Sequence, residues 1–171
     1  MERQSTTLIE KDLILSWESF VIKRTYTYFL VGILSLALIP LLFIGPNLWF
    51  SIFLQKWYVI LGAIMGFVLY NISLNKRLAR VILTGSLNSF AGGITIGCLT
   101  VLFGYIGGFL GEALEYQTQY GCSPPKPILY SSAMSLAYSY AFTSVPVLIF
   151  GLRLGSELEE RRILTLLKMN T

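Results

Sequence analysis

Residues 83–111 read LTGSLNSFAGGITIGCLTVLFGYIGGFLG, an apolar stretch that holds no charged residue and many glycines. About 20 apolar residues are enough for a helix to cross the ~30 Å hydrocarbon core of a bilayer. The stretch therefore predicts a transmembrane helix over roughly residues 83–110. The sequence leaves open whether this helix is continuous or is broken near Thr100.

The glycines of this stretch predict the face on which the helix packs. At ~100° per residue, five of them fall within about 60° of one another on a helix. They are Gly93, Gly97, Gly104, Gly108 and Gly111. Membrane helices gain little from apolar burial against one another, and small residues let their backbones approach closely. Gly62 and Gly66, four residues apart in the preceding apolar stretch, make that stretch the expected partner.

Three further apolar stretches have the length of a membrane span, at about residues 25–44, 55–74 and 128–151. Of the 171 residues, 54% are hydrophobic and 13% are charged, whereas soluble domains carry about 25% charged residues. A soluble fold of this length has too little interior to bury so much apolar surface. We therefore predict an all-α integral membrane protein with four transmembrane helices, in a domain over residues 25–151.

Amphipathic helices are predicted at both ends of the chain, in residues 1–24 and in residues 152–171 as a helix over 156–169. Each contains a hydroxyl residue and a glutamate with capping-box spacing, namely Thr7 with Glu10 and Ser156 with Glu159. Apolar residues recur at helical spacing in both segments. They are Ile9, Leu13, Trp17, Phe20 and Val21 at the start, and Leu158, Ile163, Leu166 and Leu167 at the end.

Basic residues predict the orientation in the membrane. The first segment, the loop between the second and third spans, and the tail are rich in Lys and Arg, whereas the other two connections hold only Lys56 and Lys126. The positive-inside rule then places both termini and the central loop on the cytoplasmic or matrix side. The net charge of +4 does not indicate nucleic-acid binding, because the cations sit at the ends of apolar stretches rather than in a basic stripe.

The residue types argue against an enzyme. There is no histidine, and the two cysteines, Cys98 and Cys122, do not form a metal-binding or redox motif. No charged residue lies in the middle of a span, where pumps and proton-coupled transporters carry them. We therefore expect no catalytic residue, no cofactor and no metal.

Cations of the central loop are expected to contact lipid headgroups or a partner. These are Lys76, Arg77 and Arg80. Together with Asn71 and Asn75 they make a possible phosphate-binding group, but one without an evident base or nucleophile.

The central part of the chain, GFVLYNISLNKRLARVILTGSLNSFAGGITIG, resembles the signature of the mitochondrial inner-membrane preprotein translocase channel family. Gly66, Arg80 and the Ala91-Gly92 pair fall at that family's spacings, while Leu69 replaces its aromatic residue and Thr84 its aspartate. The stretch from Leu87 to Gly93 resembles the branch that supplies an accessory membrane subunit of respiratory complex I. The resemblance covers roughly 35 residues. It implies a four-helix fold in a large inner-membrane assembly, with termini and central loop in the intermembrane space, opposite to the side that the charges indicate.

These observations favour a non-catalytic, multi-pass accessory subunit of a larger membrane complex, in the mitochondrial inner membrane or a bacterial plasma membrane. The expected partners are the lipid bilayer and other membrane subunits. The alternative is a channel or transporter component for protein or a small neutral solute, suggested by the hydroxyl-rich fourth span. A third hypothesis, an enzyme acting on lipid, rests on the phosphate-binding group of the central loop.

Overall fold

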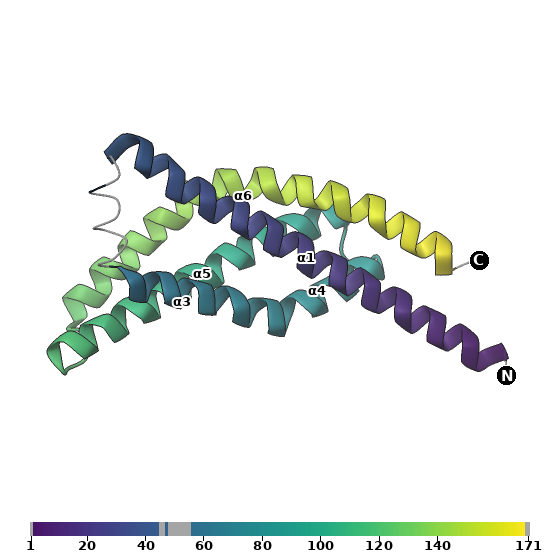
Figure 1. The fold of residues 1–171 in the computed structure, drawn as a ribbon, viewed down its shortest axis with the longest axis horizontal. Helices are drawn as coiled ribbons and strands as arrows, with labels where there is room; N and C mark the ends of the chain where they lie inside the picture. Colours follow the sequence, from purple (N-terminus) through teal and green to yellow (C-terminus); the bar gives the residue numbers. More distant parts are fainter. Residues whose placement is uncertain (1, 45–46, 48–55, 170–171) are drawn as a thin grey trace. The chain divides into compact units, whose positions relative to one another are not determined.

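The computed structural model describes residues 2–44, 47 and 56–169, and the described side chains exclude those of residues 2–10, 33–44, 136, 138–142 and 144. Every regular element in this part of the chain is helical (Figure 1). The elements are α1 (Glu2–Ile44), α3 (Trp57–Tyr70), the π-helix η1 (Asn71–Asn75), α4 (Lys76–Leu83), α5 (Ser89–Tyr120) and α6 (Lys126–Met169). The predicted all-α class is therefore confirmed.

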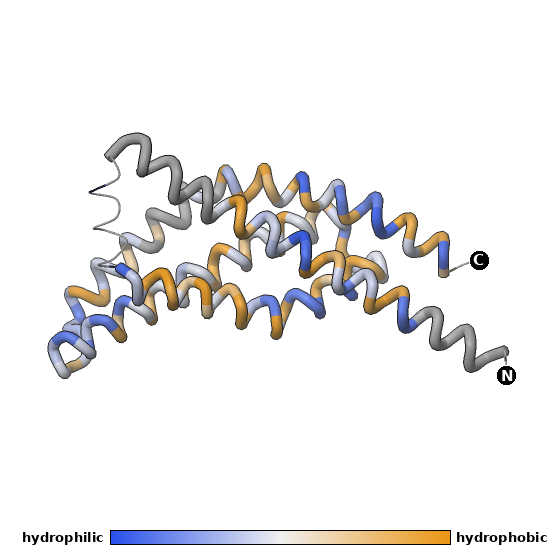
Figure 2. Tube along the Cα trace, viewed as in Figure 1, coloured by the Kyte–Doolittle hydropathy of each residue, from blue (hydrophilic) through white to orange (hydrophobic). Residues whose placement is uncertain are grey.

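Two helical stretches are long and apolar enough to cross a membrane, Trp57–Leu83 and Ser89–Tyr120. They correspond to the second and third predicted spans, and Figure 2 shows the apolar character of α3 beside the hydrophilic α4. The first and fourth predicted spans, 25–44 and 128–151, contain residues whose side chains lie outside the described part of the chain. What the structure establishes is an all-helical chain with two helices able to span a bilayer.

The terminal amphipathic segments are not separate helices. The α1 helix runs without interruption past the predicted boundary at residue 24, and α6 runs past residue 151 and through Pro146. Ser156 therefore lies inside a helix, where backbone amides bond to carbonyls one turn earlier, so the predicted capping box at Ser156 is wrong. The side chains of the other predicted capping box, Thr7 and Glu10, lie outside the described residues.

The start of α5 is set by a turn, which is why this helix begins at Ser89 and not near Leu83 as predicted. Gly85 has a φ of 79°, a conformation that residues with a Cβ rarely adopt. Asn88 then caps the new helix, because its Oδ1 accepts a hydrogen bond from the amide of Phe90 at 2.9 Å. From there α5 continues unbroken through Thr100, which settles the question of a break.

The chain divides into two compact units. Unit 1 contains residues 1–27, 71–98 and 146–171, and unit 2 contains residues 28–70 and 99–145. The core of unit 1 includes Trp17, Val21, Ile82, Ile96 and Leu158, all fully or almost fully buried.

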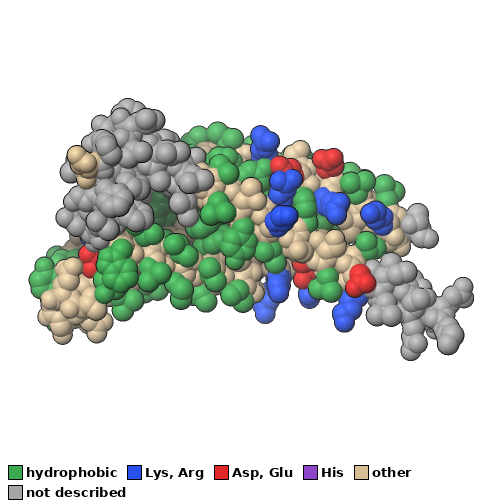
Figure 3. Space-filling view, viewed as in Figure 1, with side chains coloured by type: hydrophobic (Ala, Val, Ile, Leu, Met, Phe, Trp, Pro, Cys, Tyr) green, Lys and Arg blue, Asp and Glu red, His purple; other side chains and the backbone are tan. Residues whose placement is uncertain are grey.

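Within unit 2, Phe67 and Tyr70 of α3 are buried. Phe67 stacks on Phe29 of α1 with ring centroids 3.6 Å apart, and Tyr70 packs beside Phe103 of α5. Figure 3 shows hydrophobic side chains over α3, while Lys, Arg, Asp and Glu side chains gather over α1, α4 and α6. The two segments of unit 2, 28–70 and 99–145, contain four charged residues in their sequence, Lys56, Glu112, Glu115 and Lys126.

We predict that Asn88→Ala lowers the free energy of unfolding by about 1 kcal/mol, because the amide of Phe90 loses its acceptor. Unfolding in mixed micelles, followed by circular dichroism, measures the change. Asn88→Asp is the matched control, since its carboxylate still accepts the bond and should preserve stability. Equal losses in both variants would contradict the capping role.

Candidate functional site: glycine and polar contacts between the helices

In unit 2, α3 and α5 touch through their backbones. A Cβ on Gly62 would overlap the carbonyl oxygen of Gly107, and a Cβ on Gly66 would overlap that of Phe103. The contact is reciprocal, because a Cβ on Gly107 would collide with the carbonyl of Gly62. Gly111 lies equally close to the backbone of Tyr58. The predicted pairing of the second and third spans through Gly62 and Gly66 is therefore what the helices adopt.

In unit 1, the first part of α5 makes a second glycine contact, with α6. A Cβ on Gly93 would lie 2.5 Å from the amide nitrogen of Gly155, and a Cβ on Gly155 would lie 2.6 Å from the Cα of Phe90. Gly151 packs against Ile94, and Gly97 against Val147. The glycine face of the third span thus serves two different partner helices along its length.

This division corrects the prediction of a single groove in three respects. Among the described residues, a Cβ added to Gly104 would meet no atom within 4 Å, so Gly104 makes no close helix contact there, and a Cβ added to Gly108 would meet Val59 at ordinary van der Waals distance. Gly107, which falls outside the selected face, is central to the α3 contact. The prediction also missed Gly151 and Gly155, although their four-residue spacing was visible in the sequence.

Buried hydrogen bonds join α1 to η1 and α4 within unit 1. The indole nitrogen of Trp17 donates to the backbone carbonyl of Ala79 at 2.6 Å. Asn75 donates from Nδ2 to Thr25 Oγ1 at 3.1 Å and to Asn71 Oδ1 at 2.8 Å. An uncompensated amide or indole in such a position would cost about 1–3 kcal/mol, so these bonds fix how α1 lies on the π-helix.

The two asparagines therefore do not join the cations of the central loop. Asn71 and Asn75 are buried, and Asn75 bonds to both Thr25 and Asn71, whereas Lys76 and Arg77 are exposed. The five-residue phosphate-binding group is corrected accordingly. The π-helix is the reason, because its wider turn changes which residues share a face with the following helix.

Ion pairs tie the three segments of unit 1 together. The buried carboxylate of Glu18 in α1 bonds to Arg80 Nε in α4. Arg24 Nε lies 3.1 Å from Glu157 Oε2 in α6. Phe20 adds to this contact, since the guanidinium carbons of Arg24 and Arg161 both lie 5.6 Å from its ring centroid. Of the three predicted lipid-contact cations, Arg80 is thus paired with Glu18, although its side chain is still largely exposed.

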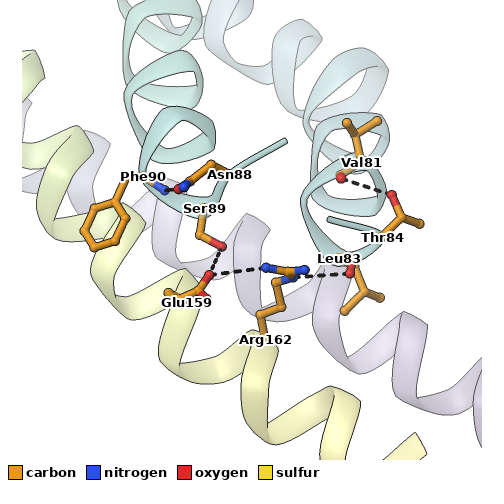
Figure 4. A network of polar contacts seen from close by, with 8 residues as sticks. All are labelled: Val81, Leu83, Thr84, Asn88, Ser89, Phe90, Glu159 and Arg162. Carbon is orange, nitrogen blue, oxygen red and sulfur yellow. Dashed lines mark hydrogen bonds and ion pairs between the residues drawn. The ribbon is translucent and has the colours of Figure 1, made fainter. Parts of the chain in front are cut away.

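A fourth connection joins α6 to the turn between α4 and α5 (Figure 4). The hydroxyl of buried Ser89 donates to Glu159 Oε2 at 2.5 Å, and Arg162 Nη1 lies 3.5 Å from the same oxygen. Arg162 Nε also donates to the carbonyl of Leu83 at 3.4 Å. Leu83 ends α4, where the helix dipole places partial negative charge that favours a cation. Glu159 and Arg162 thus hold α6 to this turn; sequence reasoning gave Glu159 a capping role with Ser156 and did not single out Arg162.

The described residues contain no group of three or more His, Cys, Asp and Glu side chains able to hold a metal ion. Cys98 and Cys122 are not joined in a disulfide. The contacts described between the helices are close backbone contacts, buried hydrogen bonds and ion pairs.

Comparisons with protein-family models, curated proteins and solved structures gave no match for this chain. The resemblance to the preprotein translocase channel family consequently stays a prediction from about 35 residues.

We predict that Gly107→Ala destabilises the protein, because the new methyl group forces α3 and α5 apart. Overpacking of this kind costs typically about 1–3 kcal/mol. Gly104→Ala is the matched control, a substitution of the same kind three residues away in the same helix with open space around it. Unfolding by sodium dodecyl sulfate titration compares them. Similar stability in the two variants would show that the α3–α5 contact is not tight.

We further predict that Ser89 and Glu159 are energetically coupled. In a double-mutant cycle of Ser89→Ala and Glu159→Gln, the coupling free energy should be about 0.5–3 kcal/mol. The adjacent exposed residue provides the control, since a cycle of Ser89→Ala with Glu160→Gln should give no coupling beyond error. Zero coupling in both cycles would show that the Ser89–Glu159 hydrogen bond does not stabilise unit 1.

Proposed function

We propose that this chain is a non-catalytic structural subunit of a larger membrane protein complex and that it crosses the bilayer four times. The single observation that carries the proposal is the composition of unit 1. Its three segments, 1–27, 71–98 and 146–171, contain all the Lys and Arg residues except Lys56 and Lys126.

Packing of the three basic segments into one unit favours their lying on one side of the membrane, as the positive-inside rule requires. The chain leaves this unit at residue 28 and returns at residue 71, then leaves again at residue 99 and returns at residue 146. Each excursion has room for two helices. Two helical hairpins with a shared basic end correspond to four crossings with both termini on the cytoplasmic or matrix side.

Exposed apolar stripes support contact with lipid. On α5, Leu102, Ile106, Leu110 and Leu114 are exposed and spaced four residues apart. On α3, Leu61, Met65 and Leu69 repeat the pattern. Large side chains in such a row are unfavourable in water, and they are suited to lipid tails or an apolar partner helix.

The end of α6 supports the presence of a protein partner. Leu158 is buried within unit 1, but Ile163, Leu164 and Leu167 are exposed at the end of the helix. This surface lies in the most charged part of the chain, among Arg161, Arg162 and Lys168, and so at the edge of the apolar spans. A partner subunit would cover it.

The polar groups of unit 1 support a structural role rather than a catalytic one. Glu18, Glu157 and Glu159 are each bonded to a side chain from another segment of the chain. In each of these carboxylates one oxygen is already paired with a side chain of this chain, which favours a structural role over that of a base acting on a substrate. The proposed complex is an inner-membrane respiratory assembly or a bacterial counterpart, an assignment that rests on the family resemblance alone.

The alternative is a channel or transporter component. The hydroxyl groups of Tyr105 and Thr143, 3.4 Å apart within unit 2, favour it, because a row of hydroxyls can line a polar path. The α3–α5 contact opposes it, since helices in backbone contact leave no space for a solute between them. Solute flux in proteoliposomes containing the purified chain alone would favour this alternative over the structural role.

The four-crossing topology predicts that the turn after α5 and the end of α6 lie on opposite sides. Cys122 is exposed in that turn, and Glu160 is exposed in α6. In sealed vesicles of known orientation, a membrane-impermeant maleimide should label Cys122 of a Cys98→Ser variant from one side. Glu160→Cys in a Cys98→Ser/Cys122→Ser background should be labelled from the other side. Labelling of both positions from the same side would overturn the topology.

The subunit role predicts that the chain leaves the membrane with partners. After extraction in a mild detergent, native mass spectrometry should detect it in an assembly heavier than the 19.2 kDa chain. Leu164→Glu and Leu167→Glu should release the chain from that assembly, while the nearby exposed position changed by Glu160→Gln should not. Migration of the unaltered chain as a lone monomer would refute the proposal.

A further inference from the structure

A small hollow in unit 2 is lined by charged, hydroxyl and aromatic side chains. It lies between the last turns of α5 and the first turns of α6, with a volume of about 170 Å³. Its polar lining includes Lys56, Glu112, Glu115 and Ser132, and its apolar lining includes Phe109 and Leu129. A water molecule occupies about 30 Å³ of the liquid, so the hollow has room for roughly six heavy atoms, and a larger ligand would extend out of its mouth.

Glu115 points to the kind of ligand. Its Oε1 accepts a long hydrogen bond of 3.4 Å from Gln119. Its Oε2 is buried and has no hydrogen bond among the described residues, and Lys56 Nζ lies 3.8 Å away, beyond hydrogen-bond distance. A buried carboxylate oxygen without a donor is costly, so the site is completed by a ligand that brings an N–H group.

Two further features favour a positively charged donor. The hollow is at the C-terminal end of α5, where the carbonyls of the last turn carry partial negative charge. The rings of Tyr116 and Tyr120 also line it, with centroids 4.6 Å apart, and aromatic faces attract cations. Glu112 supplies a second carboxylate on the same side of α5.

Lys56 supplies the complementary half of the site. Its side chain is about half exposed, and it is the cation of this hollow. Because its ion pair with Glu115 is long, the ammonium group can bind a phosphate while the carboxylates bind an amine. A ligand with a primary ammonium and a phosphate two carbons apart satisfies both halves.

We propose that this hollow binds the phosphoethanolamine headgroup of a membrane lipid. The ammonium group donates to Glu115 Oε2, the phosphate binds Lys56, and the acyl chains leave along Phe109 and Leu129. A choline headgroup fits less well, because its quaternary nitrogen has no N–H to give the unsatisfied carboxylate oxygen.

The depth of the site agrees with a lipid as the source of the headgroup. Exposed Tyr120 lines it, and exposed Trp57 and Tyr130 directly follow the lining residues Lys56 and Leu129 in the sequence. Tryptophan and tyrosine in such numbers are typical of the membrane–water interface, where headgroups lie. This part of the inference rests on the proposed membrane function, and it places the lipid at the interface opposite the basic segments.

The test uses the full chain in detergent micelles doped with one lipid at a time. Native mass spectrometry should detect retained phosphatidylethanolamine, with retention falling stepwise for its monomethyl and dimethyl derivatives and about tenfold overall for phosphatidylcholine, as expected for the loss of a charged hydrogen bond. This series needs no substitution, so misfolding cannot affect it. Equal retention of all four lipids would overturn the proposal.

Variants locate the site. Glu115→Gln and Lys56→Met should each lower phosphatidylethanolamine retention several-fold, while Glu160→Gln, in an exposed position of α6 outside the hollow, should leave it unchanged. Unaltered retention in both site variants would place the lipid elsewhere and refute the site. If soluble phosphoethanolamine displaces the lipid at equal concentration, the acyl chains contribute nothing and the lipid assignment is wrong.

The result is separable from the test of the subunit role. Glu115→Gln should still co-purify with the larger assembly, because the partner surface proposed for α6 belongs to unit 1. Loss of lipid retention with intact assembly supports the headgroup site, and loss of the assembly from the unaltered chain bears on the proposed function alone.

Discussion

Close contact between helix backbones is the constraint on which the other features of this protein depend. In the bilayer proposed for this chain, helices gain almost nothing from burying apolar side chains against each other, so their association depends on dispersion contacts and hydrogen bonds at short range. The glycines of α5 allow such close contact at two places, with α6 in unit 1 and with α3 in unit 2. Where the backbones touch there is no side chain to repack, and a single methyl group is enough to disturb the pair.

Charge is distributed unequally between the two units, and this inequality organises the polar interactions. Unit 1 uses its carboxylates to join α1, α4 and α6, with Glu18, Glu157 and Glu159 each bonded to a side chain of another segment. Unit 2 spans most of the apolar sequence with four charged residues, three of which meet at one small hollow. Burying a charged residue among apolar groups costs free energy unless the charge is paired or binds a ligand. This cost is the reason to expect a ligand in the hollow.

Sequence reasoning succeeded where a local pattern determines the outcome. The spacing of Trp17 and Val21 predicted the buried face of α1, and Gly62 with Gly66 predicted the contact with α5. It failed where the outcome depends on a neighbouring helix. The helical positions of the glycines do not show whether Gly104 or Gly107 contacts a partner helix. That depends on where α3 crosses α5. Likewise, nothing local to Ser156 and Glu159 indicates that Glu159 bonds to Ser89.

The amino-acid sequence alone determined that this chain is helical and apolar, that its cations gather in three segments, and that small residues would mediate helix contact. These properties follow from composition and periodicity, which act over one or two helical turns. The tertiary structure alone decided that α5 divides its glycines between two partners, that Asn71 and Asn75 turn inward through a π-helix, and that Lys56 meets Glu115. Those outcomes depend on residues up to about 80 positions apart, whose distances are set by helix crossing and not by any local rule.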